Sequence, residues 1–188
     1  MRAHYAPPWR VDVDIRDGVT APVAVTTLVR AIGTALDAVA APAPASIGLI
    51  LSDDAELAAL NAKHMGHDGP TDVLSFPLLS PDAFAVGARP DVPRPPGRRI
   101  HLGDMVVSVE RARDQAESGR GGHTGDVRWS VAEELRLLVT HGTLHICGRD
   151  HAEPAEEAAM RELERRLLER RSLEPRSLDG NGSASSSV

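Results

Sequence analysis

Hydrophobic and polar positions follow two different periods in the first third of the chain. Residues 9–15 (WRVDVDI) alternate apolar and charged side chains, which is the period of a half-buried β-strand. In residues 22–41 the apolar side chains recur at helical spacing between flanking prolines, which predicts an amphipathic helix. Residues 46–52 (SIGLILS) predict a second strand, and a short helix is expected over 53–63. This part of the chain therefore has the order β-α-β-α.

The middle of the chain holds two more predicted strands, separated by a proline-rich segment. Residues 70–78 (PTDVLSFPL) and 103–109 (GDMVVSV) are apolar runs of strand length. Between them, residues 80–99 combine several prolines with little apolar periodicity, so we expect an exposed loop. A helix is expected over 110–118, where the following glycines end it.

The longest helical pattern lies towards the C-terminus. It runs from about residue 126 to residue 147 and is followed by Gly148, a residue suited to a C-terminal cap. A last helix is expected at about 153–170, where Glu and Arg residues three and four apart are typical of a solvated face with ion pairs. The patterns together predict four strands and about five helices.

Length and composition fit one domain followed by a tail. The 188 residues are enough for a single core, which we place at 1–171. Residues 172–188 hold too few apolar groups to offset the entropy of ordering, so a disordered tail is expected. No apolar run reaches the length of a membrane span, and a single cysteine excludes an internal disulfide. We therefore expect a cytoplasmic protein with no membrane partner.

The formal net charge of −6 narrows the possible partners. A nonspecific nucleic-acid binder needs a basic face to displace counterions from phosphates, so the net charge argues against that class. The net charge does not exclude an enzyme that acts on RNA, because basic and acidic residues are concentrated in different segments of the chain. Arginines cluster within residues 89–99, whereas acids dominate residues 153–164.

Three histidines stand close together in the segment HGTLHICGRDH, residues 141–151. His141 and His145 are four residues apart, so both rings leave the same face of the long helix. The glycine at 148 allows a sharp turn that brings His151 back to the same point. Three imidazoles leave the fourth tetrahedral position to water, which is typical of a catalytic zinc site. The segment predicts one Zn²⁺ per chain at the end of the long helix, with iron, nickel or copper as alternatives.

The spacing of these histidines also matches the metzincin peptidases, whose pattern is H-E-x-x-H-x-x-G-x-x-H. The general base of those enzymes is the glutamate that follows the first histidine, and this chain has Gly142 there. The metal ligands are therefore present without the acid-base group of peptide hydrolysis. A zinc peptidase is the least favoured of the functions considered.

The histidine segment and three segments upstream of it resemble the motifs of a known protein family. The segment HGTLHICGRDH resembles the signature H-G-x-L-H-L-x-G-Y-D-H of the YbeY family. Three upstream segments resemble other motifs of that family in the same order, namely LN at 60–61, GPTDVLSFP at 69–77 and LGD at 102–104. The resemblance covers about residues 45–155.

The resemblance implies an α+β fold with a small mixed sheet packed against helices. It implies a single zinc bound by the residues at 141, 145 and 151. It also implies a single-strand-specific endoribonuclease that acts on ribosomal RNA, in late maturation of the small subunit at the 16S rRNA 3′ end and in ribosome quality control. The alternative is a non-catalytic ribosome assembly factor that uses its zinc for stability.

The chain departs from the family pattern at positions that would meet substrate. Where the family commonly has an aromatic-Arg pair, this chain has His64-Met65, so an arginine available to a phosphate is missing. Arg149, which stands where the signature has Tyr, or His67 could supply the positive charge. The methionine slightly favours the assembly factor over the nuclease.

Glu134 and Arg149 are the candidate catalytic residues. Glu134 lies two turns before His141 on the same side of the helix, so it could support a ligand or accept a proton, or be a plain surface residue. Cys147 is interpreted as a small apolar filler, with metal ligation as the minor alternative. Asp72 and Asp104 are most simply turn or strand-edge residues.

Overall fold

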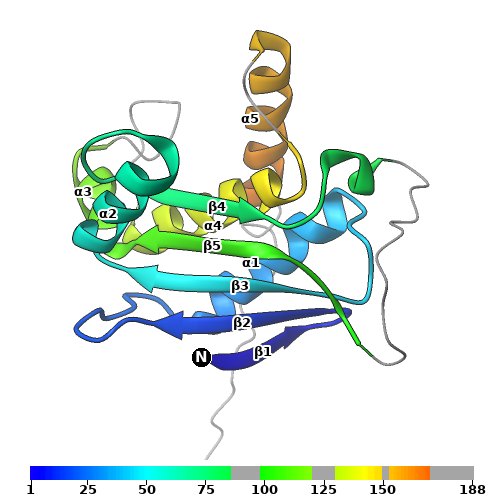
Figure 1. Ribbon diagram of the computed structural model, residues 1–188, viewed down its shortest axis with the longest axis horizontal. Coiled ribbons are helices and arrows are strands. Elements are labelled where there is room, and N and C mark those ends of the chain that lie inside the picture. The colour runs from blue at the N-terminus through cyan, green and yellow to red at the C-terminus, as the bar shows by residue number, and fades with distance from the viewer. Residues whose placement is uncertain (86–97, 120–129, 150–152, 170–188) are drawn as a thin grey trace, which may run out of the picture.

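The computed structural model describes residues 1–85, 98–119, 130–149 and 153–169, which contain a mixed five-stranded sheet (Figure 1). In chain order the strands are β1 (Arg2–Ala6), β2 (Trp9–Ile15), β3 (Ala45–Ser52), β4 (Val73–Pro77) and β5 (Ile100–Ser108). Their order across the sheet is β1-β2-β3-β5-β4. The three central strands are parallel, and the two edge strands are antiparallel to their neighbours.

The sheet has one strand more than the sequence predicts. The four predicted strands are confirmed as β2 to β5, and the additional strand is β1, which pairs with β2 from Arg2↔Val13 to Ala6↔Trp9. Most side chains of β1 are exposed. An exposed edge strand is held mainly by backbone hydrogen bonds, so it carries no hydrophobic alternation from which it could be predicted.

The five predicted helices are confirmed. They are α1 (Val25–Ala38), α2 (Asp54–Met65), α3 (Val109–Glu117), α4 (Val131–Ile146) and α5 (Pro154–Glu169). Helix α4 begins at Val131. Ser130 caps it and forms a reciprocal capping box with Glu133. The predicted loop at 80–99 begins with a short 3₁₀ turn, Pro81–Phe84, whereas residues 86–97 and the predicted tail lie outside the described residues.

Helices cover both faces of the sheet (Figure 1). On one face, α1 and α4 pack on the central strands through fully buried side chains that include Leu28, Ile32, Ile47, Leu49 and Leu135. On the opposite face, α2 contributes Leu57 to a smaller cluster with Leu74 and Val106. Each fully buried side chain of this size contributes about 1.5–3 kcal/mol of hydrophobic free energy, so the main core fixes the position of α4. None of the helices in the described ranges has the length and apolar character of a membrane span.

Candidate metal centre

The two histidines of α4 turn their rings toward one another. His141 Nε2 lies 3.0 Å from His145 Nε2, and the ring centroids are 4.5 Å apart. Two nitrogens that bind one tetrahedral zinc at about 2.0–2.1 Å lie roughly 3.3 Å from each other, so this separation fits a shared ion. Neutral imidazole is also a preferred zinc ligand, so the chemistry of the pair fits as well.

The third predicted ligand, His151, lies outside the described residues. Within the described ranges, no group of three or more His, Cys, Asp or Glu side chains is placed to hold a metal ion. The structure therefore brings together two of the three predicted ligands.

An open cleft of about 670 Å³ borders the histidine pair. Residues from α2 and from the edge strand β4 form its walls together with the C-terminal end of α4. Besides the two histidines, its polar and charged lining residues are Asn61, His67, Thr71, Asp72, Ser75 and Arg149. Met65 also lines this cleft, so the position where the family commonly has arginine faces the same space as the histidines.

Gly142 lets α4 approach β4 closely. A Cβ atom on residue 142 would lie 3.1 Å from Val73 Cγ2 and 3.2 Å from Ser75 Oγ. The Ser75 hydroxyl also donates a hydrogen bond to the Gly142 carbonyl oxygen at 3.1 Å. A larger side chain would have to displace these neighbours. Close packing therefore explains the glycine at the position where the metzincin peptidases have their catalytic glutamate.

The predicted helix cap at Gly148 is confirmed. Gly148 has a φ of +73°, and its N–H donates to the His145 carbonyl oxygen at 3.0 Å. The N–H of Arg149 donates to the Leu144 carbonyl oxygen at 3.0 Å, which completes a Schellman motif. A Cβ atom on residue 148 would also lie 2.7 Å from Pro81 Cα. This turn places Arg149 in the lining of the cleft.

Helix α5 contributes a contact that the charge pattern does not predict. Some of its charges do form exposed pairs, such as Glu162 with Arg165. Glu164, however, is 5% exposed, and its Oε1 lies 2.7 Å from His141 Nδ1. An ionised carboxylate only accepts hydrogen bonds, so the ring donates through Nδ1–H. The prediction of a solvated face is therefore wrong for Glu164.

A sequence signal for Glu164 does exist. The apolar stripe of α5 includes Met160, Leu163 and Leu167, which pack toward the interior. Glu164 lies four residues after Met160 and three before Leu167, so it falls on this stripe. An acidic residue on the buried stripe of a helix needs a polar partner, which is the clue that sequence reasoning missed.

A second cavity of about 290 Å³ lies on the other side of His141. Glu134 and Glu164 both line it, and Glu134 is 3% exposed. The alternative that Glu134 is a surface residue is therefore wrong. Glu134 does not line the larger cleft, so it approaches the histidine pair from the side away from Arg149.

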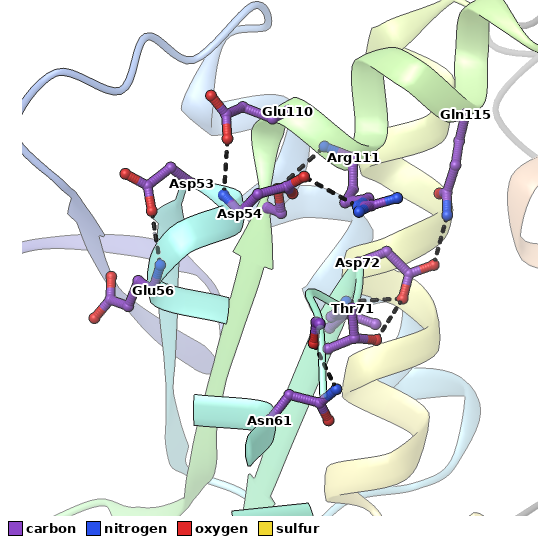
Figure 2. A network of polar contacts seen from close by, with 12 residues as sticks. Asp53, Asp54, Glu56, Asn61, Thr71, Asp72, Glu110, Arg111 and Gln115 are labelled. Atoms are coloured by element: carbon purple, nitrogen blue, oxygen red, sulfur yellow. Dashed lines mark hydrogen bonds and ion pairs between the residues drawn. The ribbon is translucent and has the colours of Figure 1, made fainter. Parts of the chain in front are cut away.

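Two residues of the upstream motifs hold the loop that enters β4 (Figure 2). The Asn61 side-chain amide donates to the Gly69 carbonyl oxygen at 2.9 Å. The Asp72 carboxylate accepts from the Val73 N–H at 2.9 Å through Oδ1 and from the Gln115 amide at 2.9 Å through Oδ2. These contacts agree with the interpretation of Asp72 as a strand-end residue. They fix the part of the loop that borders the cleft.

Cys147 and Asp104 lie outside the lining of both cavities. Cys147 is packed in the main core, where burial raises the pKa of its thiol to about 12. Its side chain is buried in this core and does not line the cleft, so the apolar-filler interpretation fits. The Asp104 carboxylate lies over Gly48 of the neighbouring strand and 3.2 Å from His101 Nε2, as expected for a strand residue.

Known proteins of one family resemble this chain. The model of the family described as "Endoribonuclease YbeY" matches residues 16–172. The chain is 44% identical over 122 residues to Endoribonuclease YbeY of Mycolicibacterium smegmatis, a match that covers 65% of this chain and 61% of that protein. It is 40% identical over 126 residues to the protein of the same name from Dehalococcoides mccartyi, a match that covers 67% of this chain and 74% of that protein. The chain thus spans less than two thirds of the length of the Mycolicibacterium relative.

The fold is also similar to a solved structure. The solution structure of TM1509 from Thermotoga maritima matches with a TM-score of 0.50 over 93% of this chain and 99% of that protein, at 22% sequence identity. At this identity the likeness concerns the fold alone. It agrees with the α+β class that the sequence predicts.

Proposed function

Because the chain belongs to the YbeY family, we propose that it is a metal-dependent endoribonuclease that acts on ribosomal RNA. The observation that carries the proposal is the pairing of His141 Nε2 and His145 Nε2 at 3.0 Å beside an open cleft. Two ligand nitrogens next to accessible space suit a catalytic metal site rather than a closed structural one. The substrate we propose is single-stranded RNA at the 3′ end of small-subunit rRNA, cleaved in the cytoplasm during subunit maturation and quality control.

The metal we propose is one Zn²⁺ per chain, held by His141, His145 and His151. When bound, zinc supplies Lewis-acid chemistry toward the scissile phosphate and acidifies water. The two described histidines would bind through Nε2 and must be neutral to do so, so metal binding should weaken in acid.

The positive charge in the cleft comes from the end of α4. Arg149 is exposed and lines the cleft with the histidines, and its guanidinium suits a bidentate contact with a phosphate. His67 lies in the same lining and can add a hydrogen-bond donor. We propose that Arg149 binds the RNA backbone in place of the arginine that Met65 replaces. The apolar side chain of Met65, which also lines the cleft, would then contact a base or a ribose of the RNA.

Glu134 is proposed to act from the inner cavity. Its carboxylate is buried on the side of His141 away from the RNA cleft. There it can stabilise the positive charge that a bound metal brings to the site, or hold a proton that leaves the cleft.

The deciding experiment is cleavage of a small-subunit rRNA 3′ precursor by zinc-loaded and chelated protein. We expect cleavage only with the loaded protein, at one zinc per chain by elemental analysis of protein without a histidine tag. If the loaded wild type binds the small subunit without cleaving RNA, it is an assembly factor and the nuclease proposal is rejected. A zinc content near zero or two per chain would reject the proposed centre.

A further inference from the structure

Glu164 is a buried acidic side chain in direct contact with a predicted metal ligand, His141. It lies on α5, separated by 23 positions from His141, and its side chain is 7% exposed. Its neighbours on the same stripe, Met160 and Leu167, are also buried. Burying a carboxylate has a free-energy cost of several kcal/mol unless a specific partner compensates it. In the described part of the chain, the carboxylate meets the His141 ring at 2.7 Å, and this hydrogen bond supplies such a partner.

This contact decides which nitrogen of His141 faces the cleft. Glu164 holds Nδ1, and Nε2 is directed at His145 Nε2. In the neutral ring only one nitrogen carries a proton, so a proton held on Nδ1 leaves the lone pair on Nε2. The ring is thereby presented in the tautomer and orientation that metal ligation requires.

We propose that Glu164 is a positioning residue for the metal centre: it fixes His141 in the Nδ1–H tautomer and tightens zinc binding through that ring. The inference rests on the metal site of the proposed function. Carboxylates behind ligating histidines typically change metal affinity about 10-fold to 100-fold when they are removed. The contact also joins α5 to α4, so zinc binding and the docking of α5 stabilise each other.

The other acids of α5 provide the contrast. Glu162 and Glu169 are exposed and pair with Arg165 along the helix surface, where ion pairs contribute little. Glu162→Gln makes the same chemical change as Glu164→Gln on the same helix, without touching a ligand. It is therefore the matched control.

The test uses the full-length chain and three variants: Glu164→Gln, Glu164→Met and Glu162→Gln. Gln keeps an oxygen that accepts from Nδ1–H but loses the charge, whereas Met keeps the length and loses both. We expect zinc affinity, measured by competition with a chelator, to fall about 10-fold for Glu164→Gln and toward 100-fold for Glu164→Met. Glu162→Gln should bind zinc as the wild type does.

A second measurement needs no metal and no RNA. Long-range ¹H–¹⁵N spectra of the metal-free protein at pH 8 report which ring nitrogen of His141 is protonated. We expect His141 to be protonated at Nδ1 in the wild type and in Glu164→Gln, and to become a mixture of tautomers in Glu164→Met. Circular dichroism of each metal-free variant checks that the fold is retained.

Each outcome bears on the inference. It is overturned if Glu164→Met keeps both the wild-type tautomer and the wild-type zinc affinity, or if Glu162→Gln weakens zinc as much as Glu164→Gln does. If the wild type binds no zinc but the tautomer still depends on Glu164, the positioning contact stands and the proposed metal-dependent function fails. If zinc binds tightly but no RNA is cleaved, only the proposed function fails.

Discussion

The two sides of His141 differ in charge. On the cleft side lie His145, His67 and Arg149, around about 670 Å³ of open space. On the inner side, around about 290 Å³, lie Glu134 and Glu164, which are 3% and 5% exposed, and the exposed ion pair of Glu157 with Arg161. His141 therefore has nitrogen donors and the Arg149 guanidinium on one side and two buried carboxylates on the other.

This separation suits an anionic substrate. A carboxylate about 4 Å from a phosphate would be repelled by about 4 kcal/mol at an effective dielectric constant near 20, so acids on the cleft side would weaken RNA binding. Asp72 is the acid among the described lining residues of the cleft, and its oxygens already accept hydrogen bonds from Val73 and Gln115. On the inner side, the Glu164 carboxylate instead contacts His141, a proposed metal ligand.

Removing the proposed metal ligand His145 should have the largest effect. His145→Ala takes away one of the two paired nitrogens, so zinc affinity should fall by more than the ~100-fold that loss of a supporting residue causes. RNA cleavage should be abolished while the protein stays folded, at a lower melting temperature in excess zinc. Chelator competition, an RNA-cleavage assay and circular dichroism measure these three effects. Cleavage at the wild-type rate would show that the nuclease activity arises elsewhere.

The inner side can be tested without removing a ligand. Glu134→Gln keeps the size of the side chain and removes its charge, so zinc stoichiometry should stay at one per chain. If this carboxylate accepts or donates a proton during cleavage, kcat should fall about 100-fold with little change in KM. A rise in KM at unchanged kcat would place Glu134 on the substrate side and contradict the division between the two faces.

The turn that carries Arg149 into the cleft depends on Gly148. Gly148→Ala should lower the free energy of unfolding by more than about 2 kcal/mol, because a left-handed alanine costs about 1–2 kcal/mol and its Cβ would press on Pro81. Gly66→Ala is the control, since Gly66 caps α2 at a φ of +71° and a Cβ atom there would meet no other atom within 4 Å. Urea unfolding of both variants measures the difference. Equal losses would mean that the contact with Pro81 contributes nothing.

The positive charge of Arg149 should strengthen RNA binding and should not change zinc affinity. Arg149→Ala should raise KM for RNA about 10-fold, corresponding to the loss of about 1.4 kcal/mol, and leave zinc affinity unchanged. Arg113→Ala, on the exposed surface of α3, is the control and should change neither quantity. The salt dependence of RNA binding should weaken in Arg149→Ala alone. If the two substitutions raised KM equally, arginines would affect RNA binding through the overall charge of the protein and not through a contact in the cleft.

The smallest effect is expected at Cys147, which belongs to neither side. Its side chain is 2% exposed, and burial raises the pKa of the thiol to about 12. A thiol-specific reagent at pH 8 should therefore react with the unfolded chain and leave the folded protein unmodified, with or without zinc. Mass spectrometry reports the modification. Rapid labelling of the folded protein would show that the thiol reaches the cleft.

Sequence alone determined the parts of this protein that depend on nearby residues. The four-residue spacing of His141 and His145 puts both rings on one helix face, and Gly148 ends that helix through contacts within a few positions. The central strands and the helices follow from local hydrophobic periodicity, because their burial repeats at a fixed period. The same local reasoning led to the family, since its motifs are short and continuous.

Tertiary structure decided the features that join distant segments. The contact of Glu164 with His141 spans 23 positions and two helices, and no local spacing encodes it. The same holds for the edge strand β1, which has backbone partners but little burial, and for Glu134, whose burial depends on the segments that pack beside α4. Periodicity reports which face of an element is apolar, but not which side chain of another element will meet a polar group placed there. The reason is that packing selects such partners only after the whole core has formed.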